Sequence, residues 1–394
     1  MKFLKLKELC TIKHGYAFKG KYITQQENNN ILVTPGNFKV GGGFKEDKCK
    51  YYNSKNIPKE YILNENDLIV TMTDLSKEAD TLGYSALIPQ KDKIYLHNQR
   101  IGLIKNINET IINKDYLYWY LRTRMYHNEI VATSTGTTVH HTSPERILNV
   151  KIPIYPLSIQ NKISKVLNII DNRIKINVQT NDNLYNICNV VFHNYIDKYS
   201  EQIEYTKIID MADRIITGKT PSTKNEEFWN GDIPFITIPD MHNQVFTIDT
   251  ERTISKVGAK SLIPKNSISV SCIATVGLVS ISTKESQTNQ QINSIVIKNA
   301  YDLYYLFEFL SEQENFMKNI AGGSTTYNIN KTTFENIEVP YLPQNIVQEF
   351  HNTVCKLFDK IKLNQLENKN LEQLRDILLP KLMSGEINID KIEI

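Results

Sequence analysis

The sequence lacks the features that mark a membrane, secreted or metal-binding protein. No apolar run among its 394 residues comes near the roughly 20 residues that a membrane-spanning helix needs. The first residues, Met1 to Glu8, alternate charged with apolar side chains, whereas a signal peptide has an unbroken apolar core. The five cysteines are far apart in the chain, and no two have zinc-ligand or redox spacing. We therefore expect a cytoplasmic protein with free thiols and no structural metal.

Motifs of catalysis are missing as well. Gly218-Lys219-Thr220 resembles the end of a phosphate-binding loop, but position 213 is Asp where that loop needs Gly. His140 and His141 are adjacent, so they cannot share one helical face as metal ligands, and no Cys or acidic cluster accompanies them. No glycine-rich cofactor fingerprint and no Asn-Pro-Pro-aromatic run occur. The sequence thus predicts no catalytic residue and no cofactor held by this chain.

Composition and charge permit a two-domain globular protein without selecting a function. The chain has 41% apolar and 23% charged residues, as globular proteins do. Its length exceeds that of a single typical core and fits two domains with connecting helices. The formal net charge of +3 is too small to indicate nucleic-acid binding, although a near-neutral chain can still carry a basic face.

A duplication is the most informative feature that is present. Ser134 to Thr138, followed by Ile152-Pro153, recurs as Ala321 to Thr325 followed by Val339-Pro340, at one constant offset. A repeat of this size indicates two similar domains, since solenoid repeats are roughly 20–50 residues long. Two domains related by a pseudo-twofold axis are suited to a two-part target, as half-sites on DNA mirror a protein dimer.

We expect an α+β fold in which two pseudo-twofold-related mixed α/β domains are separated by two long antiparallel helices. The expected order is a first sheet domain at 1–156, a long helix at 157–199, a second sheet domain at 200–343 and a C-terminal long helix at 344–394.

Shorter helices and a helix end are expected within this order. Each sheet domain should carry one helix, over about 115–131 and 301–320, before its glycine-threonine loop. Pro380 should stop or kink the last helix at Leu379, because proline lacks the amide donor and disfavours a helical residue before it.

Both long helices carry a seam of positions spaced alternately by four and three, the spacing of a coiled coil. In the first helix these positions are Ile163, Leu167, Ile170, Ile174, Asn177, Asn181, Leu184, Cys188 and Val191. The matching positions in the second helix are Phe350, Val354, Leu357, Ile361, Asn364, Asn368, Leu371, Arg375 and Leu378. An antiparallel pairing would bring the asparagine layers together, and a buried Asn sets register at a cost in stability. The alternative is that each helix packs only on its own sheet domain.

The two sheet domains have diverged more than the loops and long helices. They agree only at scattered anchors, such as Gly83 with Gly277 and Asn98-Gln99 with Asn289-Gln290. This contrast is expected if the frame is kept while each domain recognises a different sequence.

Several short motifs, in their order, resemble the specificity subunit of type I restriction–modification enzymes over essentially the whole chain. They are Gly15-Tyr16-Ala17-Phe18-Lys19, Met72-Thr73-Asp74-Leu75 followed by Leu82-Gly83, the segment Trp229 to Pro234, and the ending Leu378 to Glu386. The resemblance implies two target-recognition domains that each read half of a split site on double-stranded DNA. It also implies that the helices separate these domains and dock two methyltransferase subunits. Restriction motor subunits would join this complex for cleavage. By the same resemblance, S-adenosylmethionine, ATP and magnesium would be bound by the partner subunits and not by this chain.

Side chains able to contact DNA are present in both domains. Arg, Lys, Asn and Gln contact base edges, while Lys and hydroxyl groups hold phosphates. The candidates are Lys19, Lys21, Asn37, Lys39, Thr73, Gln99 and Arg100 in the first domain and Lys219, Thr220, Lys224, Asn243, Thr275, Gln290 and Gln291 in the second. The glycine-threonine loops add Thr137, Thr138, His140, Ser324, Thr325 and Tyr327, because hydroxyls and amides in a glycine loop suit phosphate oxygens. For any single residue, an ordinary surface or turn role is the more common alternative.

The sequence therefore predicts a non-catalytic DNA-recognition and assembly subunit in which the length of the paired helices sets the spacer between half-sites. Two alternatives stay open. A self-contained DNA-modifying enzyme would need cofactor or metal binding by this chain, and a scaffold would organise other proteins through its helices without binding DNA.

Overall fold

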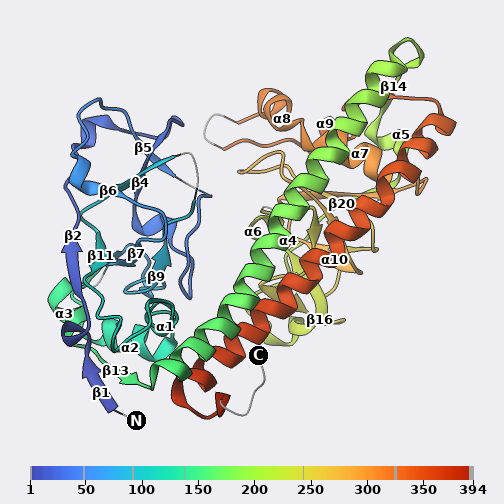
Figure 1. The fold of residues 1–394 in the computed structure, drawn as a ribbon. Helices are drawn as coiled ribbons and strands as arrows, with labels where there is room; N and C mark the ends of the chain where they lie inside the picture. The colour runs from blue at the N-terminus through green and yellow to red at the C-terminus, as the bar shows by residue number, and fades with distance from the viewer. Residues whose placement is uncertain are drawn as a thin grey trace. The chain divides into compact units, whose positions relative to one another are not determined.

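A computed structural model describes residues 2–47, 49–90, 93–136, 138–242, 244–323 and 326–389. The chain divides into two compact units: unit 1 is Met1–Asn172 with Glu372–Ile394, and unit 2 is Arg173–Leu371. Unit 1 holds the first sheet domain and unit 2 holds the second, and each unit also includes parts of both long helices. The long helices are α4 (Leu157–Lys198), green in Figure 1, and α10 (Gln344–Ser384), red.

The first domain is built on two mixed or antiparallel sheets. One sheet has the order β2 (Thr11–His14), β11 (Ile101–Lys105), β7 (Leu68–Thr71) and β9 (Ser85–Leu87). The other has the order β3 (Ile23–Thr24), β5 (Lys50–Tyr52), β4 (Asn30–Val33), β10 (Ile94–His97) and β6 (Ile62–Leu63), with β10 parallel to β4. Two small pairs complete it: β1 (Lys2–Lys5) with β13 (Lys151–Ile154), and β8 (Thr73–Asp74) with β12 (His140–His141).

The second domain repeats this topology, with one edge strand added to the first sheet and one edge strand fewer in the second. One sheet has the order β15 (Ala212–Thr217), β23 (Ile292–Ile297), β20 (Ile268–Ser271), β21 (Val279–Ser282) and β17 (Phe246–Thr247). The other has the order β18 (Arg252–Ile254), β16 (Trp229–Ile236), β22 (Ser286–Thr288) and β19 (Leu262–Ile263), with β16 parallel to β22. The pair β14 (Glu204–Lys207) with β24 (Glu338–Tyr341) corresponds to β1 with β13. The α+β class with two mixed α/β domains is thus confirmed.

Short helices connect the strands. They are α1 (Lys114–Tyr120), α2 (Arg124–Ala132) and α3 (Pro144–Asn149) in the first domain and α5 (Ile208–Met211), α6 (Ile238–Met241), α7 (Asp302–Ser311), α8 (Glu314–Ile320) and α9 (Lys331–Glu335) in the second. Turns of 3-10 helix lie at Leu6–Glu8, Gly20–Tyr22, Pro35–Asn37, Lys59–Tyr61, Ser200–Gln202 and Glu226–Phe228.

The single helices expected at 115–131 and 301–320 are wrong, because each is broken into two. In the first domain Thr123 ends α1 and begins α2: its hydroxyl donates to Tyr120 O at 2.8 Å and accepts from Tyr126 N at 3.2 Å. A threonine that caps a helix start competes with continued helix, since its side chain replaces a backbone partner. In the second domain the break lies between Ser311 and Glu314.

The expected stop of the last helix at Leu379 is also wrong, whereas the alternative of a kink there stays a prediction. Helix α10 continues through Pro380 to Ser384. Leu379, Leu382 and Met383 are 7%, 2% and 1% exposed and belong to the core of unit 1. Burial of three large apolar side chains contributes roughly 1.5–3 kcal/mol each, which offsets the hydrogen bond that Pro380 cannot donate.

The long helices pair antiparallel through the seam positions within unit 2. Asn177 Nδ2 donates to Asn368 Oδ1 at 2.9 Å, and Asn364 Nδ2 donates to Asn181 Oδ1 at 2.8 Å. Beside them, Arg173 forms a bidentate ion pair with Glu367 on α10 at 2.8 and 3.0 Å. Paired buried amides disfavour a register shift, because a shift would leave them without partners.

Each long helix also packs on the sheet domains, so the two alternatives for the helices are not exclusive. In unit 1 the start of α4 contributes Ile163 and Leu167 to the core of the first domain. In unit 2 the start of α10 contributes Phe350, Val354 and Phe358 to the core of the second domain. All seam positions are buried or half-buried.

Candidate functional site

One edge of the sheet β2–β11–β7–β9 gathers loops from several parts of the first domain. Because β2 and β7 both pair antiparallel with β11, the ends of β2 and β7 lie beside the start of β11. At this edge the chain leaves the sheet as Gly15–Tyr16 and as Met72–Asp74, and it returns as Asn98–Arg100. We call these three segments the polar edge of the first domain.

The turn Asn98–Arg100 is fixed by its own hydrogen bonds and by the neighbouring strand. Arg100 N donates to the side-chain oxygen Oδ1 of Asn98 at 3.0 Å, and Ile101 N donates to Asn98 O at 3.0 Å. Met72 N, just beyond β7, donates to Arg100 O at 2.9 Å. The side chain of Asn98 thus takes the place of a backbone partner, as in other Asx turns.

The segment Gly15–Tyr16 runs against this turn from the other side. Tyr16 N donates to His97 O at 2.9 Å, and Gln99 N donates to Tyr16 O at 3.0 Å. A Cβ atom at Gly15 would lie 2.0 Å from Asn98 O, so no other residue fits at this close approach of two backbones.

The second domain has the same arrangement at Asn289–Gln291. Gln291 N donates to Asn289 Oδ1 at 3.0 Å, and Ile292 N donates to Asn289 O at 3.2 Å. Cys272 N, just beyond β20, donates to Gln291 O at 2.7 Å. The turn is therefore held by the same three kinds of contact as in the first domain.

The glycine contact is repeated too. Lys219 N donates to Thr288 O at 2.9 Å, and a Cβ atom at Gly218 would lie 2.1 Å from Asn289 O. Gly218–Lys219, Cys272–Ala274 and Asn289–Gln291 form the polar edge of the second domain. The side chains at matching positions are Tyr16, Gln99 and Arg100 on one edge and Lys219, Gln290 and Gln291 on the other.

A buried histidine lies beneath the turn of the first domain. His97 is 0% exposed, and its Nε2 donates to Ile101 O at 2.8 Å across the turn. Burial lowers the pKa of His97 to about 4, so the ring is neutral at physiological pH. Thr288, also 0% exposed, has the matching position in the second domain.

The glycine-threonine loops lie next to the polar edges and are closed alike. Thr135 and His141 exchange two backbone hydrogen bonds of 3.0 and 2.8 Å, as Gly322 and Asn328 do at 2.9 Å each. Beyond each loop an amide fastens the chain to the polar edge of its domain: Thr142 N donates to Met72 O at 3.0 Å, and Ile329 N donates to Cys272 O at 2.9 Å.

Both loops need a glycine at one position. Gly136 has φ +99°, and its Cβ would lie 2.0 Å from Val139 O; Gly323 has φ +106°, and its Cβ would lie 2.3 Å from Thr326 O. Residues other than glycine are strained at such φ values, and their Cβ atoms would clash with a carbonyl oxygen at such distances.

Asp74 organises the loop that leaves the polar edge of the first domain. It is 4% exposed and accepts hydrogen bonds from Ser76 N at 2.6 Å and from Thr81 N and Oγ1 at 2.5 Å each. Burial alone would raise the pKa of Asp74, but the hydrogen bonds from Thr81 and Ser76 outweigh burial and lower it. Ala274 has the matching position in the second domain, so this anchor belongs to one domain alone.

Comparison with protein families identifies the chain. A model described as the type I restriction modification DNA specificity domain matches residues 1–186 and again residues 200–374. The chain belongs to this family. The two matches contain the first and second domains, which are called the first and second specificity domains from here on.

Individual proteins agree with this assignment. The chain is 46% identical over 188 residues to the type I restriction enzyme HindI specificity subunit of Haemophilus influenzae, covering 46% of this chain and 41% of that protein. It is 33% identical over 189 residues to the MjaIX specificity subunit of Methanocaldococcus jannaschii, covering 45% of this chain and 43% of that protein. The chain thus matches less than half the length of each of these relatives.

A solved structure has the same fold over nearly the whole chain. The crystal structure of a type I restriction–modification system S subunit from M. genitalium matches with a TM-score of 0.60 and 15% identity, covering 97% of this chain and 96% of that one. At this identity the likeness concerns the fold alone.

Most of the predicted contact residues are accessible on the specificity domains. The exposed ones are Lys19, Lys21, Lys39, Arg100, Thr138, Lys219, Thr220, Lys224, Thr275, Gln290 and Tyr327, and the half-buried ones are Gln99, His140 and Gln291. Thr137, Asn243, Ser324 and Thr325 lie outside the described residues. The polar edges and the adjoining loops bring together Gln99 with Arg100, and Lys219 with Gln290 and Gln291.

Two predicted contact residues are corrected, because their side chains are internal. Asn37 is 0% exposed: its Oδ1 accepts from Thr34 N at 2.9 Å and its Nδ2 donates to Lys45 O at 3.2 Å. Thr73 is 4% exposed, and its hydroxyl is hydrogen-bonded to His141 Nδ1 at 3.1 Å. Both stabilise loops and present no free polar group to a ligand, which residue type alone did not reveal.

Other residues of the polar edges were missed as parts of a site. Asn98 and Asn289 are anchors shared by the two sequences, and this signal is sufficient to identify the turn. Tyr16 lies at the edge with 36% exposure, in edge-to-face contact with Phe18 at 5.1 Å. Nothing in the local sequence distinguishes Tyr16 from a core tyrosine.

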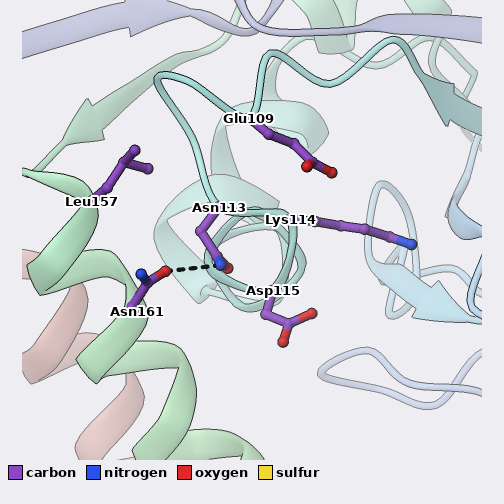
Figure 2. Close-up of a pocket in the computed structure, with 6 residues that line it drawn as sticks. All are labelled: Glu109, Asn113, Lys114, Asp115, Leu157 and Asn161. Atoms are coloured by element: carbon purple, nitrogen blue, oxygen red, sulfur yellow. Dashed lines mark hydrogen bonds between the residues drawn. The ribbon is translucent and has the colours of Figure 1, made fainter.

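A hollow of about 330 Å³ lies between α1 and the start of α4, and several of its polar side chains are hydrogen-bonded to one another or to neighbouring residues (Figure 2). Asn113 Nδ2 donates to Asn161 Oδ1 at 2.9 Å, as Figure 2 shows. Lys114 Nζ donates to Asn66 O at 2.6 Å, and Asp115 accepts from Asn168 at 2.8 Å. The hollow is best explained as a hydrogen-bonded joint between the first specificity domain and its helix.

The described residues hold neither a metal-binding cluster nor a membrane-spanning helix. There, no three His, Cys, Asp or Glu side chains are grouped so that they could hold a metal ion. No helix in the same residues is long and apolar enough to cross a membrane.

Proposed function

We propose that this chain is the DNA sequence-specificity subunit of a type I restriction–modification complex and performs no chemistry itself. Each specificity domain reads one half of a bipartite site with its polar edge. The observation that carries the proposal is the pair of edges, which share one backbone arrangement and differ in side chains. Such a frame suits two different half-sequences, because bases are distinguished by the donors and acceptors that they present in the major groove.

Contacts to the phosphate backbone come from the lysines and loops around each edge. Lys19 and Lys21 follow Tyr16 in the chain, and Lys224 follows Lys219; all four lysines are exposed. The positive charge of these lysines attracts DNA without sequence preference. Because the formal net charge of the chain is only +3, this attraction is confined to the surface around each edge.

The long helices dock two methyltransferase subunits in this proposal. Within unit 2, α4 exposes Ile176, Ile187 and Val190 at 53%, 49% and 58%, and α10 exposes Leu363 at 60%. Exposed apolar side chains grouped on helices favour a protein partner. Restriction motor subunits join for cleavage, and S-adenosylmethionine, ATP and magnesium are held by the partner subunits.

Mapping of N6-methyladenine tests the proposal. The chain is co-expressed with a cognate methyltransferase subunit, and host DNA is read by single-molecule sequencing. We expect a split motif with a fixed spacer that is absent when this chain is omitted. Methylation by this chain alone would support the enzyme alternative. An unsplit motif, or methylation unchanged without this chain, would support the scaffold alternative.

A second experiment tests whether the helices set the spacer. Insertion of one heptad into α4 together with one into α10 keeps the seam in phase while lengthening both helices. We expect a changed spacer with both half-sequences kept. A change in the half-sequences instead would contradict this role of the helices.

A further inference from the structure

We propose that positions 99 and 100 in the first specificity domain, and positions 290 and 291 in the second, read the bases, with Asn98 and Asn289 as positioning residues. This assignment rests on the proposed DNA-recognition function. It selects four residues from the wider set of polar candidates and gives each domain the same reading device.

The first argument is that these four side chains stand on a fixed backbone. Each turn is closed by its asparagine and flanked by a glycine segment. It is also bonded to a strand end, Met72 or Cys272, to which the chain just beyond the glycine-threonine loop is bonded as well. A fixed turn places its side chains at little cost in conformational entropy on binding. The lysines on the surrounding loops are exposed, and a flexible four-carbon stem suits contact with phosphates.

The second argument is that polar groups on the turns remain available. In the described part of the chain, the exposed Arg100 guanidinium has no hydrogen-bond or ion-pair partner. Oε1 of Gln99 has no partner either, but it is buried, so Arg100 is the more accessible of the two. In the second domain, Gln290 Oε1 accepts from the Thr220 hydroxyl, and Gln291 Oε1 accepts from Asn289 Nδ2 at 3.0 Å. Each of these oxygens keeps a second lone pair, and both amide groups keep donors.

The third argument is chemical. Arg pairs in bidentate fashion with O6 and N7 of guanine, and Gln pairs with N6 and N7 of adenine. The first domain presents Gln99 with Arg100, whereas the second presents Gln290 with Gln291. We therefore expect one half-site to contain a guanine that depends on Arg100, and the other to depend on adenines at the positions read by the two glutamines.

Exchange of one residue between the turns provides the sharpest test. Arg100→Gln gives the first turn the same Gln-Gln pair as the second, and Gln291→Arg is the reciprocal change. Co-expressed with the methyltransferase subunit, Arg100→Gln should reduce the preference for guanine at one position of one half-site by roughly 5- to 150-fold. The other half-site and the spacer should stay unchanged, which shows that the variant folds and assembles. Gln291→Arg should alter the other half-site alone.

Two further sets of variants serve as controls. Arg124→Gln, on the exposed first turn of α2, makes the same chemical change away from the turn and should leave both half-sites unchanged. For the positioning role, Asn98→Ala should weaken the base preference at the half-site that Arg100 reads. Asn98→Asp keeps the side-chain oxygen that accepts from Arg100 N, so it should retain that base preference.

The outcomes separate this inference from the proposed function. If the parent chain directs no split motif, the proposed function itself fails. If it does, and Arg100→Gln and Gln291→Arg leave both half-sites intact, the turns are not the readers. Should a variant abolish methylation, the purified complexes are compared on duplexes with each base at each half-site position. Relaxed preference at one position then supports the assignment, and an equal fall on all duplexes contradicts it.

Discussion

Replacement of Glu308 by glutamine should stabilise the protein at alkaline pH. Glu308 lies on α7, is 0% exposed, and is surrounded by Tyr185, Cys188, Asn189 and Glu312 of the same unit. Its Oε2 accepts from Asn189 Nδ2 at 3.4 Å, and its Oε1 has no partner among the described residues. Burial, with a smaller contribution from the charge of Glu312, raises the pKa of Glu308 to about 8 against the opposing bond from Asn189.

The sign and size of the effect follow from linkage. Between pH 4.5, the value for a solvated glutamate, and pH 8, the folded chain holds a proton that the unfolded chain releases. The free energy of unfolding therefore falls as pH rises through this window. The full difference corresponds to about 5 kcal/mol above pH 8, at about 1.4 kcal/mol per pKa unit. Glutamine has nearly the same shape and no charge, so its variant escapes this loss.

Urea-induced unfolding of the full chain, followed by circular dichroism at several pH values, measures the difference. Glu308→Gln should match the parent within about 1 kcal/mol at pH 5 and exceed it by about 3–5 kcal/mol at pH 8.5. Glu285→Gln, on an exposed loop of the same unit, is the matched control and should show no pH-dependent gain. If Glu308→Gln is no more stable than the parent at pH 8.5, Glu308 is not held as a neutral buried acid.

Three further sets of substitutions test features of the frame. Gly323→Ala should lower the free energy of unfolding by about 1–3 kcal/mol, because Gly323 has a positive φ and a blocked Cβ position. Gly322→Ala should not, because a Cβ there would meet only Asn328 O, at an ordinary contact distance of 3.8 Å; thermal unfolding measures both. The double variant Asn181→Leu with Asn364→Leu should raise the midpoint of thermal unfolding, because both buried amides are removed together. Either substitution alone should lower the midpoint, because one amide is left unpaired. A double variant with a lower midpoint than the parent would contradict this. Asp74→Asn weakens three hydrogen bonds and should make the loop at 75–81 more sensitive to trypsin, and an unchanged cleavage rate would show that the carboxylate does not hold the loop.

The duplication could be predicted from sequence wherever the two copies kept the same spacing. The offset that relates Gly136 to Gly323 also relates Thr142 to Ile329, whose amides make matching bonds to the polar edges. The residue spacing within the loop and the long helix is the same in both copies, because each is one continuous segment and an insertion within it would disrupt the local structure.

The match between the polar edges is only partly visible in the sequence, where Asn98-Gln99 and Asn289-Gln290 agree but the glycine segments do not align with them at one offset. Gly15 corresponds to Gly218 and Asn98 to Asn289, but the two pairs are separated by different numbers of residues. Loops between strands tolerate insertions, since their backbone lies at the surface. Hydrogen bonds that hold the edges together therefore identify partners that alignment at a constant offset misses.

The errors at helix ends have two causes, one local and one tertiary. A helical pattern continues through Leu121 to Thr123, yet the Thr123 side chain caps a new helix there. Pro380 is a helix breaker by local rules, yet α10 continues because the residues around it are buried in the core of unit 1. In each case contacts or capping outside the local pattern outweigh the propensity of single residues.

By itself, the sequence determined that this protein has two related domains, each followed by a long helix with a seam of apolar and asparagine positions. Periodicity carries this information, because a repeat and a helix face are set by neighbours along the chain. Tertiary structure alone decided which polar side chains are available to a ligand. Asn37 and Thr73 are consumed by internal hydrogen bonds, whereas Arg100 is left exposed on a fixed turn. The physical reason is that burial of a polar group depends on strands that pair across long stretches of sequence.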